Sequence, residues 1–145
     1  MANFITDDIP FEIGKGIVLN PGEDVTIVAT GHLVWEALQA AEALEVQGVS
    51  AEVINIHTIK PLDTELLISS VQKTGCIVSA EEHNYLGGLG ESIAAALALK
   101  HPTPQAFVAT NDTFGESGTP AQLMEKYGLN KDAIVAACNK VLKRK

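Results

Sequence analysis

Short β-branched runs alternate along this chain with longer segments of helical periodicity, and no other feature constrains the fold as much. The first long run, VTIVAT, has the uniformly apolar character of a strand that is buried on both faces. Strands separated by helices form a parallel sheet covered on both sides, so we expect one three-layer α/β/α domain. The predicted strands are residues 17–19, 25–30, 51–56, 76–80 and 105–110, and the predicted helices are 33–47, 64–73, 91–100, a short segment from 119, and 131–142.

Local signals set several of these boundaries. Asp63 and Asn130 are suited to cap helices, because their side chains can accept hydrogen bonds from free amides of the first turn. Gly48 is placed to end the first helix, and Thr119-Pro120 has the cap residue and the proline that begin a short one.

The first part of the chain lacks a clear period. Residues 1–16 contain a proline and two glycines, and we interpret them as an interdomain linker or wrapping arm, which leaves 17–145 as the domain. By local turn rules, Asn20-Pro21-Gly22 would join the strand at 17–19 to the strand at 25–30 as a hairpin.

Charge and composition exclude several classes of protein. The net charge of −8 argues against nucleic acid as a partner, because the phosphate backbone would be repelled. The hydrophobic content of 46% excludes a disordered chain, and no apolar run is long enough to span a membrane. Cys76 and Cys138 form no metal or disulfide pattern, so we expect two buried free thiols in a reducing cytoplasm. A basic cluster is expected to complement the end of the last helix and to fray into solvent: Lys140, Lys143, Arg144 and Lys145.

Polar and glycine-rich segments follow the predicted strands. In open α/β sheets, ligands and partners gather beyond the carboxyl ends of the strands. The sequence therefore predicts either a site or a docking surface at that edge, formed by residues 30–32, 57–60, 81–84 and 111–118.

Two binding interpretations of this edge each have a structural alternative. The amides of the glycine-rich turn 87–90 could cradle a phosphate, yet the turn matches no nucleotide fingerprint, and glycines also permit close helix–sheet packing. Glu81, Glu82, His83 and His57 could bind a metal, yet consecutive residues of a strand point in alternating directions. Packing is the better interpretation of the glycines, and a metal site has little support.

Catalytic interpretations are weaker still. His83 could act as a general base beside Glu81, but the sequence places no nucleophile, and Ser117 is typical of a turn serine. Trp35 lies beside the apolar stripe of the first helix, where it is either an interface anchor or a half-buried packing residue. His32 is expected at a helix start and His101 on the surface.

Five segments in one order resemble the C-terminal domain of transketolase, especially that of split bacterial and archaeal transketolases. Related domains occur in the β subunits of pyruvate-dehydrogenase-type enzymes and in deoxyxylulose-phosphate synthase. The segments are PFEIGKG (10–16), DVTIVATG (24–31), VINIHTIKPLD (53–63), IVSAEEHNYLGGLGES (77–92) and FGESGTPAQLMEKYGL (114–129).

The resemblance implies a five-stranded mixed sheet whose first short strand is antiparallel to the rest, with strand order similar to 1-3-2-4-5. This order conflicts with the hairpin expected from local turn rules, and we prefer it, because such pairing is decided by tertiary contacts.

The resemblance also implies a function. Transketolase transfers a two-carbon ketol unit between sugar phosphates in the pentose phosphate pathway, using thiamine diphosphate and Mg²⁺. In the family, other domains hold the cofactor, and their GDG motif is absent here. We therefore expect a piece of a longer, cytoplasmic, homodimeric enzyme: a domain that binds no cofactor alone, is inactive as an isolated fragment, and supports the remaining domains or subunit.

The predicted docking residues are His83, Asn84, Gly87, Gly88, Gly90 and Trp35. Two alternatives remain open at this stage. One is a free-standing module that binds a phosphate or nucleotide at the turn 87–90, and the other is a small hydrolase that uses Ser117 and His83.

Overall fold

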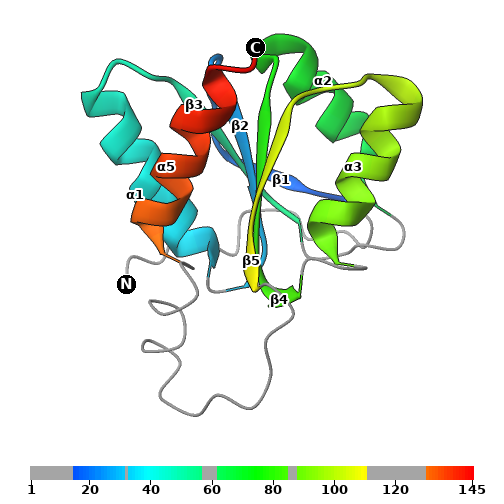
Figure 1. Cartoon of the computed structure of the whole chain (residues 1–145), viewed down its shortest axis with the longest axis horizontal. Helices are drawn as coiled ribbons and strands as arrows, with labels where there is room; N and C mark the ends of the chain where they lie inside the picture. Colours follow the sequence, from blue (N-terminus) through cyan, green and yellow to red (C-terminus); the bar gives the residue numbers. More distant parts are fainter. Residues whose placement is uncertain (1–14, 32, 57–61, 85–87, 111–129) are drawn as a thin grey trace.

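A computed structural model describes residues 15–31, 33–56, 62–84, 88–110 and 130–145 of the chain (Figure 1), without the side chains of 82–84 and 109–110. Within these ranges strands and helices alternate, as the sequence predicts. In chain order the elements are β1 (Ile17–Asn20), β2 (Val25–Ala29), α1 (Leu33–Val46), β3 (Ala51–Asn55), α2 (Thr64–Thr74), β4 (Ile77–Asn84), α3 (Leu89–Lys100), β5 (Gln105–Thr110) and α5 (Lys131–Leu142). The short helix predicted from Thr119 lies outside the described residues.

The five strands form one mixed sheet in the order β1-β3-β2-β4-β5. β1 is antiparallel to β3, and the remaining pairs are parallel. This confirms the order that the resemblance implies, and the local hairpin expectation for β1 and β2 is wrong. β2 already has β3 and β4 on its two edges, and the Asn20 side-chain amide donates to the Ala51 carbonyl at 2.9 Å, which directs the turn toward β3.

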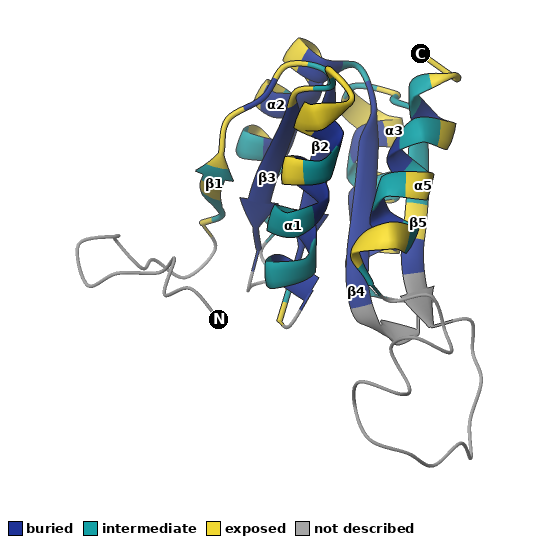
Figure 2. Cartoon of the chain, turned by 90° about the vertical axis from the view of Figure 1, so that its left-hand side faces the viewer, coloured by how far each residue is buried: buried dark blue, intermediate teal, exposed yellow. Residues whose placement is uncertain are grey.

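Two helical layers cover the sheet. In Figure 1, α1 and α5 lie on one face of the sheet and α2 and α3 on the other. Figure 2 shows the buried strands between them, and every residue of β2 and β3 is buried. Alternate residues of β2 serve the two cores: Ile27 packs with α1 and α5, whereas Val28 packs with α2 and α3.

The caps agree with the sequence. The Asp63 side chain accepts from the Leu66 amide, and the Asn130 side chain accepts from the Ala133 amide. Gly48 follows α1 with φ of 82°, a conformation that glycine adopts without strain. β4 differs from the prediction, because it continues beyond residue 80 to Asn84, where it pairs with Thr110 of β5.

Both cysteines are buried free thiols, as predicted. Burial raises the pKa of the Cys138 thiol to about 12, with a smaller contribution from Cys76. Burial also raises the pKa of the Cys76 thiol, with Lys145 opposing and Asp24 adding to the shift. Neither sulfur is therefore an activated nucleophile near neutral pH.

The last two residues do not fray, which corrects the expectation for the basic cluster. The Arg144 guanidinium donates to the Gln105 carbonyl, and the Lys145 ammonium donates to the Asp24 carbonyl, both at 3.0 Å. These cations meet backbone carbonyls at the start of β5 and just before β2, so the end of the chain lies against the sheet. None of the helices in the described ranges combines the length and the apolar character needed to cross a bilayer.

Candidate functional site

The carboxyl ends of β2, β3, β4 and β5 meet along one side of the sheet, which we call the carboxyl edge. β1 begins there, because Ile17 lies opposite Asn55 at the end of β3. The crossover helices start from this edge, so their N-termini, with their free amides and positive dipole ends, point toward it. Such an edge is where an anionic ligand would bind in a fold of this kind.

Glu81 fills the N-terminus of α3. The residue is only 1% exposed, and its two carboxylate oxygens accept from the Leu89 amide at 2.8 Å and the Gly90 amide at 2.6 Å. Gly88, the residue before the helix, has no side chain to supply this cap. A buried carboxylate of the chain itself therefore occupies the position that a bound anion would take.

The other described helices are also capped from within. At α2, Asp63 accepts from the Leu66 amide at 3.3 Å. At α5, Asn130 accepts from the Ala133 amide, and the Glu36 carboxylate of α1 accepts from the Lys131 amide, both at 2.9 Å. At α1, the first amides donate to the backbone carbonyls of residues 30 and 31.

This capping argues against a phosphate cradle at the glycine-rich turn. A phosphate at α3 would have to displace Glu81 from two short, charge-assisted hydrogen bonds and leave a buried charge unpaired. The packing interpretation is confirmed at Gly90, where an added Cβ would lie 2.5 Å from the Phe107 ring and 2.6 Å from the Ser79 hydroxyl. Gly88 is half-buried, and Gly87 lies outside the described residues.

The metal-site and general-base interpretations both relied on Glu81. Both oxygens of Glu81 are bonded to amides, so this carboxylate is already used as a helix cap. Among the side chains that the structure describes, no three of the metal-ligating types gather. His32, His57 and Ser117 lie outside the described residues.

The predicted docking residues fall in two places. His83 and Asn84 are on the last part of β4, beside the turn that leads to Gly88 and Gly90. Trp35 lies apart from them, half-buried in the first turn of α1. Their role as an interface stays a prediction.

Sequence reasoning missed what three carboxylates do. Glu81 was considered as a metal ligand or as a partner of His83, and Glu36 was not considered. Asp63 was predicted as a cap, but its second bond, from the Gly16 amide at 2.8 Å, joins residues 47 positions apart. The one sequence signal is that Glu81 follows the apolar run of β4 and precedes a glycine-rich helix start.

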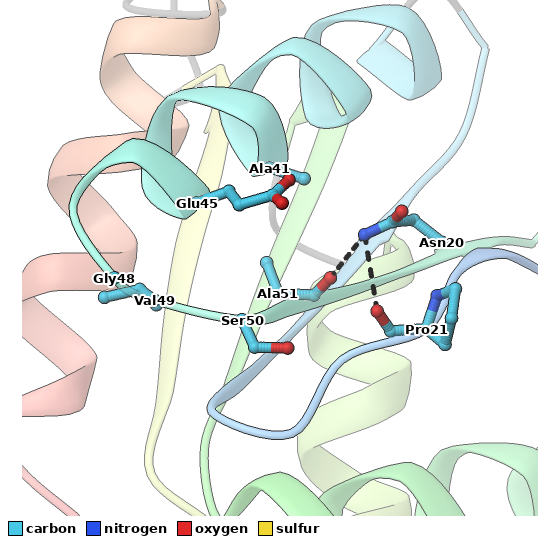
Figure 3. A pocket seen from close by; sticks show the side chains of 8 residues that line it. All are labelled: Asn20, Pro21, Ala41, Glu45, Gly48, Val49, Ser50 and Ala51. Atoms are coloured by element: carbon cyan, nitrogen blue, oxygen red, sulfur yellow. Dashed lines mark hydrogen bonds between the residues drawn. The ribbon is translucent and has the colours of Figure 1, made fainter.

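A shallow hollow of about 380 Å³ lies at the opposite, amino edge of the sheet (Figure 3). It is open to solvent, and the Asn20 amide on its wall donates to the Ala51 and Pro21 carbonyls. Its lining residues are Asn20, Pro21, Ala41, Glu45, Gly48, Val49, Ser50 and Ala51. The Glu45 carboxylate is its one ionisable group, and it is exposed, so the hollow offers little specific chemistry.

These observations give a class of domain: a three-layer α/β/α domain with a mixed sheet, in which the N-termini of the described helices already bond to groups of the chain itself. Comparison with known families then gives a match over residues 14–134 to the family described as transketolase, C-terminal domain. The chain belongs to the transketolase C-terminal domain family.

Individual relatives agree. The chain is 47% identical over 135 residues to 6-deoxy-6-sulfo-D-fructose transketolase subunit SqwH of Clostridium sp. (strain MSTE9), covering 93% of this chain and 42% of the relative. It is 40% identical over 126 residues to the 1-deoxy-D-xylulose-5-phosphate synthase of Trichormus variabilis, covering 86% of this chain and 20% of that enzyme.

A solved structure described as a split gene transketolase, inactive beta4 tetramer, superposes with a TM-score of 0.93 at 47% identity, covering 98% of this chain and 46% of that one. This chain thus spans less than half the length of each of these proteins.

Proposed function

We propose that this chain acts as an assembly domain of a cytoplasmic transketolase and holds no active site of its own. The observation that carries the proposal is the filling of the helix N-termini at the carboxyl edge by the chain's own groups, above all by Glu81. A domain that gathered a diphosphate would leave those amides free. The family and the relatives support a role within a larger transketolase-type enzyme.

In the assembled enzyme the reaction is the transfer of a two-carbon ketol unit between sugar phosphates, as in the pentose phosphate pathway, with thiamine diphosphate and Mg²⁺. The residues described here do not fit this cofactor, because the amides suited to its diphosphate are bonded to carboxylates, carbonyls and Asn130. The cofactor is therefore expected to be held by other domains or a partner subunit. One relative is named for a sulfo-sugar and another for deoxyxylulose phosphate synthesis, so the sugar substrates are left open.

The carboxyl edge is the proposed docking surface, with His83, Asn84, Gly87 and Gly88 at its centre and Trp35 at its side, whereas Gly90 is buried and shapes the start of α3. It would contact the neighbouring catalytic domain and support a homodimer of the complete enzyme. Residues 1–16 would be the connection to that domain.

Gly88→Val tests the docking surface in the complete enzyme. The added side chain at the start of α3 should weaken subunit assembly about tenfold, and cofactor chemistry should recover when enzyme concentration is raised. Ala98→Val is the matched control, because Ala98 is exposed on the same helix, away from this edge. Analytical ultracentrifugation and a ketol-transfer assay report the two effects. Intact assembly with lost turnover in Gly88→Val would show that the docking assignment is wrong.

A second experiment separates the assembly domain from a free-standing binding module. Calorimetric titration of this chain with thiamine diphosphate, sugar phosphates and nucleotides should give no saturable heat. Adding a partner that carries the cofactor-binding domains should then produce ketol-transfer activity. Tight binding of any of these phosphates by the chain alone would favour the module.

A further inference from the structure

One carboxylate at the carboxyl edge bonds to two separate parts of the chain. The Asp63 Oδ1 atom accepts from the Leu66 amide at 3.3 Å and so caps α2. Its Oδ2 atom accepts from the Gly16 amide at 2.8 Å. A cap needs only the first bond, so the second bond requires a separate explanation.

The backbone at Gly16 is held closely by its surroundings. A Cβ atom there would lie 2.9 Å from the Leu66 side chain and 3.1 Å from the Ile56 side chain. The next residue, Ile17, enters the sheet opposite Asn55. Gly16 therefore sits between the first turn of α2 and the end of β3, at the point where the chain joins the sheet.

The bond lies outside the pairing of the sheet. β1 itself is held by β3, which pairs with Ile17, Val18 and Asn20 and has an irregular register between Val18 and Asn20. An ionised carboxylate as acceptor and a distance of 2.8 Å make the Gly16 bond a short, charge-assisted hydrogen bond. Its effect is to fix the direction of the backbone on the N-terminal side of β1.

We propose that Asp63 is a positioning residue that fixes where the interdomain connection enters the domain and so holds the preceding domain over the carboxyl edge. This inference rests on the proposed function, because it takes residues before Gly16 as the connection to a catalytic domain. The Oδ1 atom organises α2, and the Oδ2 atom sets the angle at which the connection approaches the proposed docking surface.

Asp63→Ser separates the two roles. A serine hydroxyl can still accept from the Leu66 amide, but it has no second oxygen for Gly16. In hydrogen exchange of this chain, the Gly16 amide should exchange about tenfold faster while the Leu66 amide stays protected. Asn130→Ala is the matched control, because it removes a helix cap that makes no contact with Gly16.

Association with the catalytic domains then tests the positioning role. Asp63→Ser should weaken the association of this chain with them about tenfold, whereas Asn130→Ala should leave it unchanged. Gly16→Ala is a second variant that keeps the α2 cap but crowds the backbone against the Ile56 side chain at 3.1 Å and the end of the Leu66 side chain at 2.9 Å, and it should weaken association in the same direction.

The outcomes are distinguishable. If the unmodified chain does not associate with the catalytic domains, the proposed function fails and this inference fails with it. If the unmodified chain associates with the catalytic domains and both Asp63→Ser and Gly16→Ala bind them as tightly as the unmodified chain does, only the positioning role is wrong. If Gly16 exchange is unchanged in Asp63→Ser, the hydrogen bond itself does not exist in solution.

Discussion

The two edges of the sheet use charged side chains differently. At the carboxyl edge, Glu81, Asp63 and Glu36 accept hydrogen bonds from backbone amides of helix starts and of Gly16. Toward the amino edge, Glu52 also accepts from a backbone amide, that of Gly22 at 3.2 Å, but its shorter bonds are an ion pair with Lys73 and a bond to a chain of hydroxyl groups. The carboxyl edge thus orders the backbone around a proposed docking surface, whereas the amino edge ties a helix to the sheet.

The amino-edge network is closed within the domain. Glu52 accepts from the Lys73 ammonium at 2.6 Å and from the Ser70 hydroxyl at 2.7 Å. The Thr26 hydroxyl lies 2.7 Å from both the Ser70 and the Thr74 hydroxyls. The Ser70 hydroxyl has a single hydrogen, which it donates to the ionised Glu52 carboxylate. In its other bond Ser70 must therefore accept from the Thr26 hydroxyl. Satisfied buried networks of this kind stabilise a fold without leaving a group for a partner.

A polar edge is therefore not by itself evidence of a ligand site. Glu81, Asp63 and Glu36 at the carboxyl edge and Glu52 at the amino edge each have a partner inside the domain. The carboxyl edge differs in that its carboxylates bond to backbone amides at helix starts and at the point where the chain enters the sheet, without an ion pair in the part of the chain that the structure describes. The following substitutions test this contrast.

The largest effect is expected from crowding the amino edge. A Cβ at Gly22 would lie 2.2 Å from the Ala51 carbonyl carbon and 2.4 Å from the Glu52 nitrogen, and neither backbone atom can move without breaking β3. Gly22→Ala should lower the free energy of unfolding by about 3 kcal/mol or more. Gly90→Ala should cost less, about 1–2 kcal/mol, because its Cβ would contact side chains, the Phe107 ring at 2.5 Å and the Ser79 hydroxyl at 2.6 Å, and side chains can rotate where backbone cannot. Urea denaturation measures the free energy of unfolding of both variants. Equal losses would contradict the contrast between the backbone contacts at Gly22 and the side-chain contacts at Gly90.

Removing the internal anion should have the next largest effect. Glu81→Ala leaves the buried amides of Leu89 and Gly90 without an acceptor, and should cost about 2–3 kcal/mol. Glu81→Gln keeps one acceptor and should cost less. If thermal unfolding shows no loss for Glu81→Ala while phosphate begins to stabilise that variant, the start of α3 is an anion site after all.

The effect expected at Glu52 is small and depends on pH. Burial alone would raise the pKa of its carboxyl, but hydrogen bonds from Lys73, Ser70 and the Gly22 amide outweigh it and hold the pKa below its ordinary value. A lowered pKa means that the stabilisation is present above the pKa of the unfolded chain and is lost as pH falls through that of the folded protein. Glu52→Gln should lower the free energy of unfolding by about 1–2 kcal/mol at pH 7. The difference in this free energy between the unmodified chain and Glu52→Gln should become smaller in acid.

Denaturation of both forms between pH 7 and pH 3 measures this dependence. Lys73→Met is the control, because it removes the partner whose side chain is 42% exposed and should cost less than Glu52→Gln. A difference that stays constant over the whole range would mean that Glu52 is not ionised in the network.

Much of the fold followed from local patterns. The apolar runs predicted β2 to β5 because strands buried on both faces need unbroken hydrophobic residues, and Asp63 and Asn130 marked helix starts. The buried state of Cys76 and Cys138 followed from their lack of any pairing pattern. The sequence also predicted that the carboxyl ends of the strands share one edge, as they do in the described part of the sheet. Its docking role is still a prediction.

Local patterns in the sequence predicted the elements and the layers, and the resemblance to transketolase predicted the strand order, including the pairing of β1 with β3. Neither predicted that Glu81 faces the start of α3 or that Asp63 reaches Gly16, which only the folded domain shows. The physical reason is that periodicity and capping act over a few residues, whereas these contacts join groups brought together only when the sheet forms.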